Sequence, residues 1–426
     1  MVNEMKEHLF GNRNFSFMFT GRILSNMGDS IYYVAAMWLV YELGGSAFYT
    51  GLAGFLTMLP TVLQFLVGPL VDRFSTKKVL TIVQLFQAGL ILMIPVAHFI
   101  GYLNVAVILT IMPVVSMMNQ FTYPAQTAAL PRIIKKEQLV KGNALFTFAY
   151  QGVDMIFNAL TGILLPLIGA ITLFMLDSAV FLAAALMYSS LRLPEKDSTP
   201  KRTLKESTLQ YKKELAEGVM IVFRSYLAIF LFASVVANGA IGATYAILPV
   251  YTGELAGASW YGWYLGAISL GLLSGAALAP ILTRFPLGLL TITLFFIGGG
   301  SWILSGLSGV SIMGVVLFGI AWLPIGATNI ITGAAIQSIM PSHLMGRVFS
   351  VVASMSAMAM PLGSLLGGSM ANRWGSATIF ISAAGAIIFI SIFWLSVSKL
   401  RRLPSSHELC AADLLLPENS HSTNVG

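Results

Sequence analysis

The sequence predicts an all-helical polytopic membrane protein with twelve transmembrane helices in two pseudo-symmetric bundles of six. Its composition points to this fold, because 57% of the 426 residues are hydrophobic and only 10% are charged, whereas about 25% of a soluble domain is charged. The mean hydropathy of +0.82 applies to the whole chain. These values leave no room for a large soluble domain.

Apolar runs long enough to cross a bilayer recur along the whole chain. About 20 apolar residues span the hydrocarbon core, and the runs are separated by short loops. The predicted spans are 15–41, 47–70, 79–99, 104–124, 143–168, 171–191, 227–250, 260–283, 288–307, 311–333, 348–371 and 375–398.

The positive charge is distributed unevenly between the two sides of the predicted membrane. Among the loops after odd-numbered spans, only that after the eleventh span holds a base, Arg373. Because Lys and Arg concentrate in cytoplasmic loops, we expect both termini and all even-to-odd loops in the cytoplasm. The net charge of +7 is explained by this topology rather than by a nucleic-acid partner. The bases after even-numbered spans include Arg73, Lys77, Lys78, Arg132, Lys135, Lys136, Lys141, Arg192, Arg284, Arg347, Lys399, Arg401 and Arg402.

A polar segment in the middle of the chain separates two apolar halves, and with the polar tail this gives four predicted regions. Residues 1–191 form a first six-helix bundle, 192–226 a cytoplasmic linker with a candidate surface helix, 227–402 a second bundle and 403–426 a disordered cytoplasmic tail. The bundles resemble repeats, since 51–74 aligns with 262–285 and 162–174 aligns with 368–380. Those alignments match Arg73 with Arg284 and Gly169 with Gly375, and they place Asp72 on Thr283.

Four charged residues lie inside the predicted spans, where charge is costly and usually functional. They are Arg22 and Asp29 in the first span, Asp154 in the fifth and Asp177 in the sixth. One interpretation is proton coupling, because an intramembrane carboxyl can bind and release a proton during transport. The alternative is that these groups are paired or hydrogen-bonded and only hold helices together. Arg22 and Asp29 are two helical turns apart, so they share one face.

Aromatic and amide side chains inside the spans are candidates for lining a central cavity. Aromatic rings suit large amphipathic solutes, although each ring can equally face lipid or pack in a core. The candidates are Tyr32, Tyr33, Gln64, Asn119, Gln120, Tyr123, Gln151, Asn158, Asn238, Tyr245 and Asn329.

Signatures of catalysis are missing from the chain. There is no phosphate-binding Gly-x-x-x-x-Gly-Lys-Ser/Thr, no His-Glu-x-x-His and no Gly-x-Ser-x-Gly, and the five His residues have no metal-ligand spacing. We therefore expect no enzyme activity, no metal and no cofactor.

A charged loop follows the second span, with the pattern Gly68-Pro69-Leu70-Val71-Asp72-Arg73, then Lys77-Lys78. It resembles the signature loop between helices 2 and 3 of the major facilitator superfamily of transporters. The resemblance implies a gate latch, in which Asp72 faces the N-terminus of a helix in the other half. Arg347 precedes the predicted eleventh helix and is a candidate partner. The alternative is that these charges only enforce topology.

Further motifs resemble the macrolide-efflux-like branch of drug:proton antiporters. They are Gly21-Arg22, Ser25-Asn26-Met27-Gly28-Asp29, Pro124-Ala125-Gln126, Asn143-Ala144-Leu145 and Asp177-Ser178. The chain departs from the antiporter pattern in the fifth span, where a Gly-Pro-x-x-Gly-Gly motif is weak, while a closer version lies at Pro361 to Gly368.

This resemblance implies a transporter of a bacterial inner membrane that exports an amphipathic small molecule in exchange for protons by alternating access. The proton gradient would be its energy source, with Asp29 as the main coupling group and Arg22 as its electrostatic partner, and we expect a monomer. An importer or a lipid transporter on the same fold is an alternative, and a non-transporting membrane sensor or scaffold is another.

Overall fold

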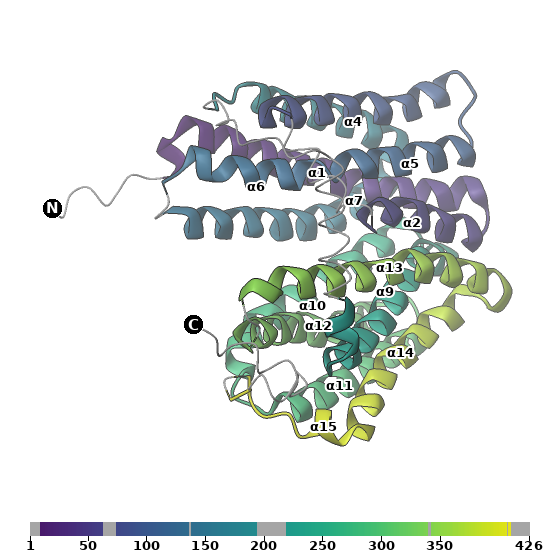
Figure 1. Ribbon diagram of the computed structural model, residues 1–426. Helices are drawn as coiled ribbons and strands as arrows, with labels where there is room; N and C mark the ends of the chain where they lie inside the picture. Colours follow the sequence, from purple (N-terminus) through teal and green to yellow (C-terminus); the bar gives the residue numbers. More distant parts are fainter. Residues whose placement is uncertain are drawn as a thin grey trace. The chain divides into compact units, whose positions relative to one another are not determined.

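The computed structural model describes residues 9–62, 74–135, 138–193, 219–339, 342–406 and 408–409 (Figure 1). These residues form helices joined by short turns, with one isolated bridge between Pro286 and Ser405. Two compact units are present: one comprises residues 1–197 and 252–266, and the other comprises 198–251 and 267–426. The predicted domain boundaries at 191 and 227 flank residues 194–218, which lie outside the described residues. The candidate surface helix of the linker, predicted from Lys205 to Arg224, is described only at its end, where residues 219–223 are helical.

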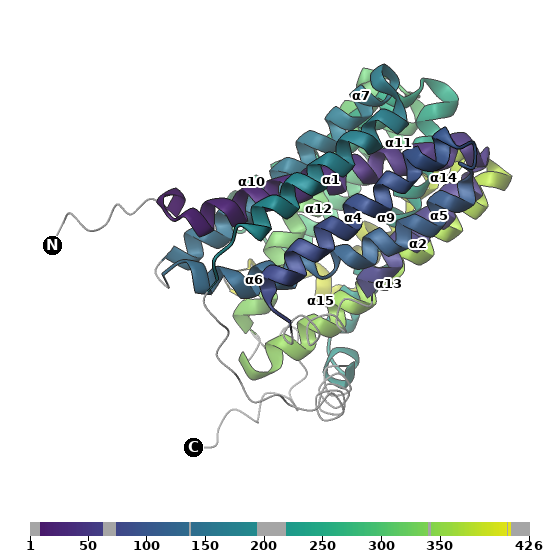
Figure 2. The same cartoon turned by 90° about the horizontal axis from the view of Figure 1, so that it is seen from above.

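The first unit consists of long helices that lie side by side in both views (Figures 1 and 2). Helix α1 packs mainly on α7, α4 packs on α7 and α5, and α2 packs on α5. The bounds are η1 Leu9–Gly11, α1 Arg13–Gly44, α2 Ala47–Val62, α4 Thr76–Phe99, α5 Val105–Asn119, α6 Thr122–Ile133 and α7 Leu139–Ser189.

The second unit repeats this helical pattern. Helix α11 packs on α12 and α14, and α13 packs on α14. The end of α9 and the start of α10 belong to the first unit, since residues 252–266 do. The bounds are α9 Leu227–Leu255, α10 Ala258–Leu282, α11 Leu287–Leu307, α12 Ile312–Ile339, α13 Ser342–Trp374, α14 Ser376–Ser396 and α15 Ser398–Arg401.

Nine helices in the described part of the chain are long and apolar enough to cross a membrane. One of them, Lys141–Ser189, contains two helices that meet at Gly169, where the backbone leaves the helical region. Helix α2 ends at residue 62, where the description stops, and it is a shorter apolar helix. The all-helical fold is confirmed, while the count of twelve spans stays a prediction.

In the part of the chain that the structure describes, six glycines with positive φ mark the tight turns between helices. They are Gly45, Gly101 and Gly169 in the first half and Gly257, Gly309 and Gly375 in the second. A left-handed backbone favours glycine because other residues meet a steric penalty there. Gly169 and Gly375, which the sequence repeat aligns, share nearly the same dihedral angles, φ 78° and ψ 156° against φ 85° and ψ 150°. The backbone therefore supports an internal duplication.

Residues 403–406, which follow the short helix α15, form hydrogen bonds with the rest of the second unit. The backbone N–H of Leu287 donates to the carbonyl of Pro404 at 2.9 Å, and Ser406 Oγ donates to the carbonyl of Thr283 at 3.4 Å. Leu403 is buried. The segment predicted to be disordered from residue 403 therefore begins with ordered contacts that cap α11, and residues 410–426 lie outside the described part.

Candidate functional site

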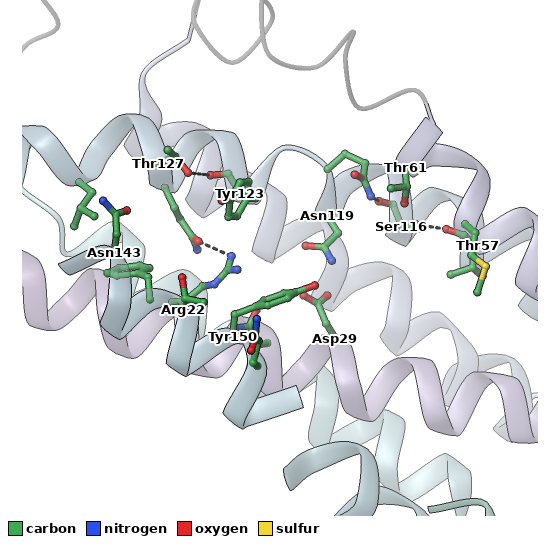
Figure 3. A pocket seen from close by; sticks show the side chains of 18 residues that line it. Arg22, Asp29, Thr57, Thr61, Ser116, Asn119, Tyr123, Thr127, Asn143 and Tyr150 are labelled. Carbon is green, nitrogen blue, oxygen red and sulfur yellow. Dashed lines mark hydrogen bonds between the residues drawn. The ribbon is translucent and has the colours of Figure 1, made fainter. Parts of the chain in front are cut away.

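A cavity of about 640 Å³ lies inside the first unit, between the ends of α1, α2, α5, α6 and α7 (Figure 3). Its described lining is rich in amides and hydroxyls and includes one base, Arg22, and one acid, Asp29. The lining residues are Arg22, Asn26, Asp29, Thr57, Met58, Thr61, Ser116, Asn119, Gln120, Tyr123, Gln126, Thr127, Leu130, Asn143, Phe146, Thr147, Tyr150 and Gln151.

Arg22 is held in the cavity wall by neutral groups. Its side chain is 5% exposed, and Nη1 donates a hydrogen bond to Gln126 Oε1. The rings of Tyr150 and Tyr123 lie 4.9 and 5.7 Å from the guanidinium carbon, within cation–π range. Gln126 is fixed in turn, because its amide donates to the hydroxyl of Tyr188 at 2.6 Å. The guanidinium is therefore positioned without a direct carboxylate partner among the described residues.

Asp29 lies two turns further along α1 and faces the same cavity. The amides of Asn119 on α5 and Gln87 on α4 lie beside its carboxyl, and Figure 3 shows the ring of Tyr150 reaching toward it. Gln87 accepts a hydrogen bond from Gln84 at 3.2 Å. Asp29 and Arg22 form no direct ion pair. The predicted pairing is limited to an electrostatic interaction between the two side chains.

Asp154 and Asp177 lie outside the cavity lining. Ser30 Oγ donates to Asp154 Oδ1 at 2.9 Å, which ties α7 to α1. Asp177 is fully buried, and neither of its carboxyl oxygens has a hydrogen-bond partner in the described structure. Its approach to α1 depends on Gly28, where a Cβ would lie 3.0 Å from Asp177 Oδ1. Among the three predicted acids, only Asp29 therefore lines this cavity.

The other predicted cavity residues are distributed over both units. Asn119, Gln120, Tyr123 and Gln151 line the cavity, whereas Tyr32, Tyr33 and Asn158 do not. In the second unit, Asn238 donates to the carbonyl of Ser234 at 2.8 Å, Tyr245 packs edge-on against Trp322, and Asn329 is exposed.

The predicted gate motif lies mostly outside the described residues. Gln64, Gly68, Asp72 and Arg73 are not described, and neither is the side chain of Arg347, although α13 includes its backbone. Lys77 and Lys78 occupy the first turn of α4. A positive charge at a helix N-terminus is unfavourable, because the helix dipole is positive there. Membrane topology therefore explains the position of these two lysines better than helix stability does.

Sequence reasoning missed most of the lining hydroxyls together with Gln126, Asn143 and Tyr150. The signal that could have found them is helical periodicity. Polar residues recur every three or four positions from Ser116 to Thr127, and again from Asn143 to Gln151, which places each set on one helix face.

Comparison with known proteins places the chain in a family. Residues 9–423 match the model of the transmembrane secretion effector family, so the chain belongs to that family of the major facilitator superfamily. It is 27% identical to the MFS-type transporter YkuC of Bacillus subtilis, over 80% of this chain and 81% of that protein.

Two relatives are named as efflux proteins. The chain is 24% identical to the multidrug efflux pump Tap of Mycolicibacterium fortuitum, over 89% of this chain and 95% of that protein. It is 25% identical to macrolide efflux protein A of Streptococcus pyogenes, over 91% and 96%.

Solved structures show the same fold. The nucleoside transporter NupG matches with a TM-score of 0.67 and 12% identity, over 91% of this chain and 98% of that chain. A bacterial homologue of the lysosomal transporter Spinster, in an inward-facing conformation, matches with a TM-score of 0.66 and 12% identity, over 94% and 98%. The chain is thus a multi-pass membrane transporter of the major facilitator fold.

Proposed function

We propose that this transporter exports an amphipathic small molecule in exchange for protons by alternating access. The observation that carries the proposal is the cavity of about 640 Å³, in which Asp29 supplies the one carboxyl among the described lining residues. This volume lies within the range of about 300–1,000 Å³ that accommodates drug-sized ligands. Two relatives that span nearly the whole chain are named as efflux proteins, which favours export.

Asp29 serves this function because solute and proton can compete for one carboxyl. In the ionised form it attracts a cationic group of the solute, and in the protonated form it does not. A proton arriving from outside therefore releases the solute there, and loss of the proton inside restores binding. The proposal needs no cofactor, metal or catalytic step, and the proton gradient supplies the energy.

The proposed location is the inner membrane of a bacterium, with both termini in the cytoplasm and a monomer as the working unit. The asymmetry of Lys and Arg between the loops supports this orientation. An importer or lipid transporter on the same fold is the alternative. In an importer, solute and protons would move in the same direction.

Transport in inverted membrane vesicles tests the proposal. A strain that lacks the protein is first screened against a panel of toxic amphipathic compounds, and a compound that becomes more toxic is then used as the transport probe. An acid-inside gradient should drive uptake of that probe into inverted vesicles, and collapse of the gradient should stop it. Uptake that requires the opposite gradient would indicate an importer instead.

A further inference from the structure

The cavity of the first unit carries two opposite charges that do not neutralise each other by contact. Arg22 and Asp29 both line it and both belong to α1. Seven residues of helix place their backbones about 10 Å apart along the axis. A solute that contacts both side chains therefore needs two polar groups that are well separated.

Arg22 has spare capacity for an anionic group of the solute. A guanidinium has five N–H donors. Among the described residues, Arg22 makes one hydrogen bond, to the neutral amide of Gln126, and its Nε has no partner. The side chain is 95% buried, which strengthens an interaction with an anion because water is excluded. Such charge-assisted bonds are stronger than neutral ones.

If solute and protons move in opposite directions, protonation of Asp29 must weaken binding of the solute, and this requirement restricts the charge that the solute can carry. A solute with only an acidic group would bind Arg22 more tightly when Asp29 is protonated, which gives co-transport with protons rather than exchange. A solute with only an amine would compete with protons for Asp29, but it would leave Arg22 buried without an anion. A solute with both groups satisfies Arg22 and still competes with protons.

We infer that the solute is a zwitterion, with an acidic group on Arg22 and a protonated amine on Asp29. This inference rests on the proposed proton exchange, because that exchange excludes the purely anionic solute. The aromatic rings of Tyr123, Tyr150 and Phe146 also line the cavity, and those of Tyr123 and Tyr150 lie against Arg22, so they suit a rigid, partly apolar core that joins the two groups.

Other ionisable groups lie near Asp29 or near its neighbours, and Asp154 and Asp177 among them lie outside the cavity lining. No charged side chain of α4 or α5 lines the cavity. The groups that interact electrostatically with Asp29, or that interact with its neighbours, are Tyr32 on α1, Tyr123 on α6, and Tyr150, Asp154, Asp177 and Tyr188 on α7.

Three forms of one fluorescent compound test the inference with the full-length protein in lipid nanodiscs. Norfloxacin is a zwitterion with a carboxylate and a piperazine amine, its methyl ester keeps only the amine, and its N-acetyl derivative keeps only the carboxylate. Equilibrium binding of the three is compared at pH 6 and pH 8. At pH 8 we expect the zwitterion to bind at least about tenfold more tightly than either derivative, as loss of one charge-assisted contact predicts.

The change with pH reports on the subsite of Asp29. Acidification should weaken binding of the ester, because protons occupy Asp29, and it should weaken binding of the zwitterion as well, because its carboxylate is also protonated in part. If the ester binds as well as the zwitterion at pH 8, or if the zwitterion fails to bind, the inference is wrong.

A matched pair of arginine variants assigns the acidic group to its subsite. Arg22→Gln should remove the preference for the zwitterion over the ester, and Arg22→Lys should restore part of it. Arg13→Gln is the control, since Arg13 also belongs to α1 but packs over the ring of Phe17 outside the cavity lining. An unchanged preference in Arg22→Gln overturns the inference, and the three-compound comparison in the unaltered protein decides it even if that variant does not fold.

Transport distinguishes failure of this inference from failure of proton exchange. If a proton gradient drives export of the ester as well as of the zwitterion, exchange stands and the zwitterion inference fails. If the zwitterion binds through Arg22 but no gradient drives it, the two-charge site stands and proton exchange fails.

Discussion

The two units differ in the kind of polar group that they bury. The first unit buries a guanidinium, a carboxyl and several long amides, among them Arg22, Asp177 and Gln126. The second unit, over its described residues, buries no charged or amide side chain; besides the rings of Trp and Tyr, its buried polar side chains are hydroxyls. These are Ser225, Thr244, Thr291, Ser305, Thr328, Ser356, Ser364, Ser376 and Ser391.

The buried groups also differ in part in the bonds that they make, since several hydroxyls of the second unit bond within their own helix, while Ser356 bonds to Ser234 on α9 at 2.9 Å. In the second unit, Thr244, Thr291 and Thr328 each donate to a carbonyl one turn earlier in the same helix, at 2.7 to 2.8 Å. In the first unit, side chains bond to side chains on other helices, as Ser25 does to Gln84 at 2.7 Å and Gln126 does to Tyr188. Burial of these hydroxyl groups in a bilayer costs little free energy, whereas burial of the charged groups of the first unit costs much more.

The second unit is instead held by rings and close backbone contacts. Trp302, Phe318, Trp322 and Phe380 form one aromatic cluster, and Tyr251 stacks on Phe380 with centroids 4.4 Å apart. On the proposed function, we expect the first unit to carry the chemistry of transport and the second unit to provide a rigid counterpart.

The largest expected effect is that of a substitution at Asp29, which tests whether the first unit carries the proton coupling. Asp29→Asn should abolish proton-driven accumulation of the solute while exchange of solute for solute continues, because the amide retains its size but cannot carry the proton. Uptake by inverted vesicles under an imposed pH gradient measures the first property, and counterflow measures the second.

Asp154→Asn is the matched control in the same unit. Asp154 bonds to Ser30 and does not line the cavity, so we expect this variant to remain coupled. Full uphill transport by Asp29→Asn would show that the carboxyl of Asp29 is only structural.

The second unit should respond to steric change rather than to charge. A Cβ on Gly242 would overlap the backbone carbonyl of Met360, because α9 and α13 approach each other there. We expect Gly242→Ala to lower the free energy of unfolding by about 1–3 kcal/mol, as overpacking does. Thermal unfolding of the purified protein measures the shift in Tm.

Gly300→Ala is the matched control within the same unit. A Cβ at Gly300 meets nothing within 4 Å, and alanine favours a helix over glycine by about 0.5–1 kcal/mol. Gly300→Ala should therefore keep or raise Tm. Equal stability of both variants would mean that α9 and α13 separate without cost, and the second unit would not be the rigid one.

Much of the fold could be predicted from the sequence because the bilayer imposes a length and an apolar composition on each span. The predicted break between 168 and 171 coincides with Gly169, whose positive φ ends one helix and begins the next. The extension of the predicted fourth span as α6, as far as Ile133, could not be predicted, because its hydroxyls and amides lower the hydropathy of that stretch. They face the cavity rather than lipid.

The candidate site could be predicted only in part, for a related reason. Arg22 and Asp29 stand out because charge in a span is rare. Gln126, Asn143 and Tyr150 do not, since an amide or a phenol in one sequence gives no sign of the helix that it faces. The absence of a direct ion pair between Arg22 and Asp29 depends on the position of Gln126, which Tyr188 on another helix determines.

Removal of that anchor should have a moderate effect on the first unit. Tyr188→Phe deletes the hydroxyl that holds Gln126, so Gln126 and Arg22 lose their fixed orientation. A net hydrogen bond contributes about 0.5–1.5 kcal/mol, and we therefore expect solute affinity to fall by roughly 2- to 13-fold. Equilibrium binding measures this effect. Tyr102→Phe, at an exposed turn, is the control and should bind as the unaltered protein does; equal affinity in both variants would show that Gln126 needs no anchor.

The smallest expected effect concerns the predicted gate latch, where the two halves differ by one charge. The counterpart of Asp72 in the second half is Thr283, whose hydroxyl donates to the carbonyl of Pro280 at 2.8 Å within its own helix end. A latch would therefore act on one side only. A carboxylate near a helix N-terminus contributes about 0.3–1 kcal/mol when exposed, so Asp72→Asn should raise the inward-open population by roughly 2- to 5-fold. Distances between spin labels across the cytoplasmic ends of the helices measure this population. Thr283→Val should leave it unchanged, and an unchanged population in Asp72→Asn as well would leave Asp72 as a topology determinant alone.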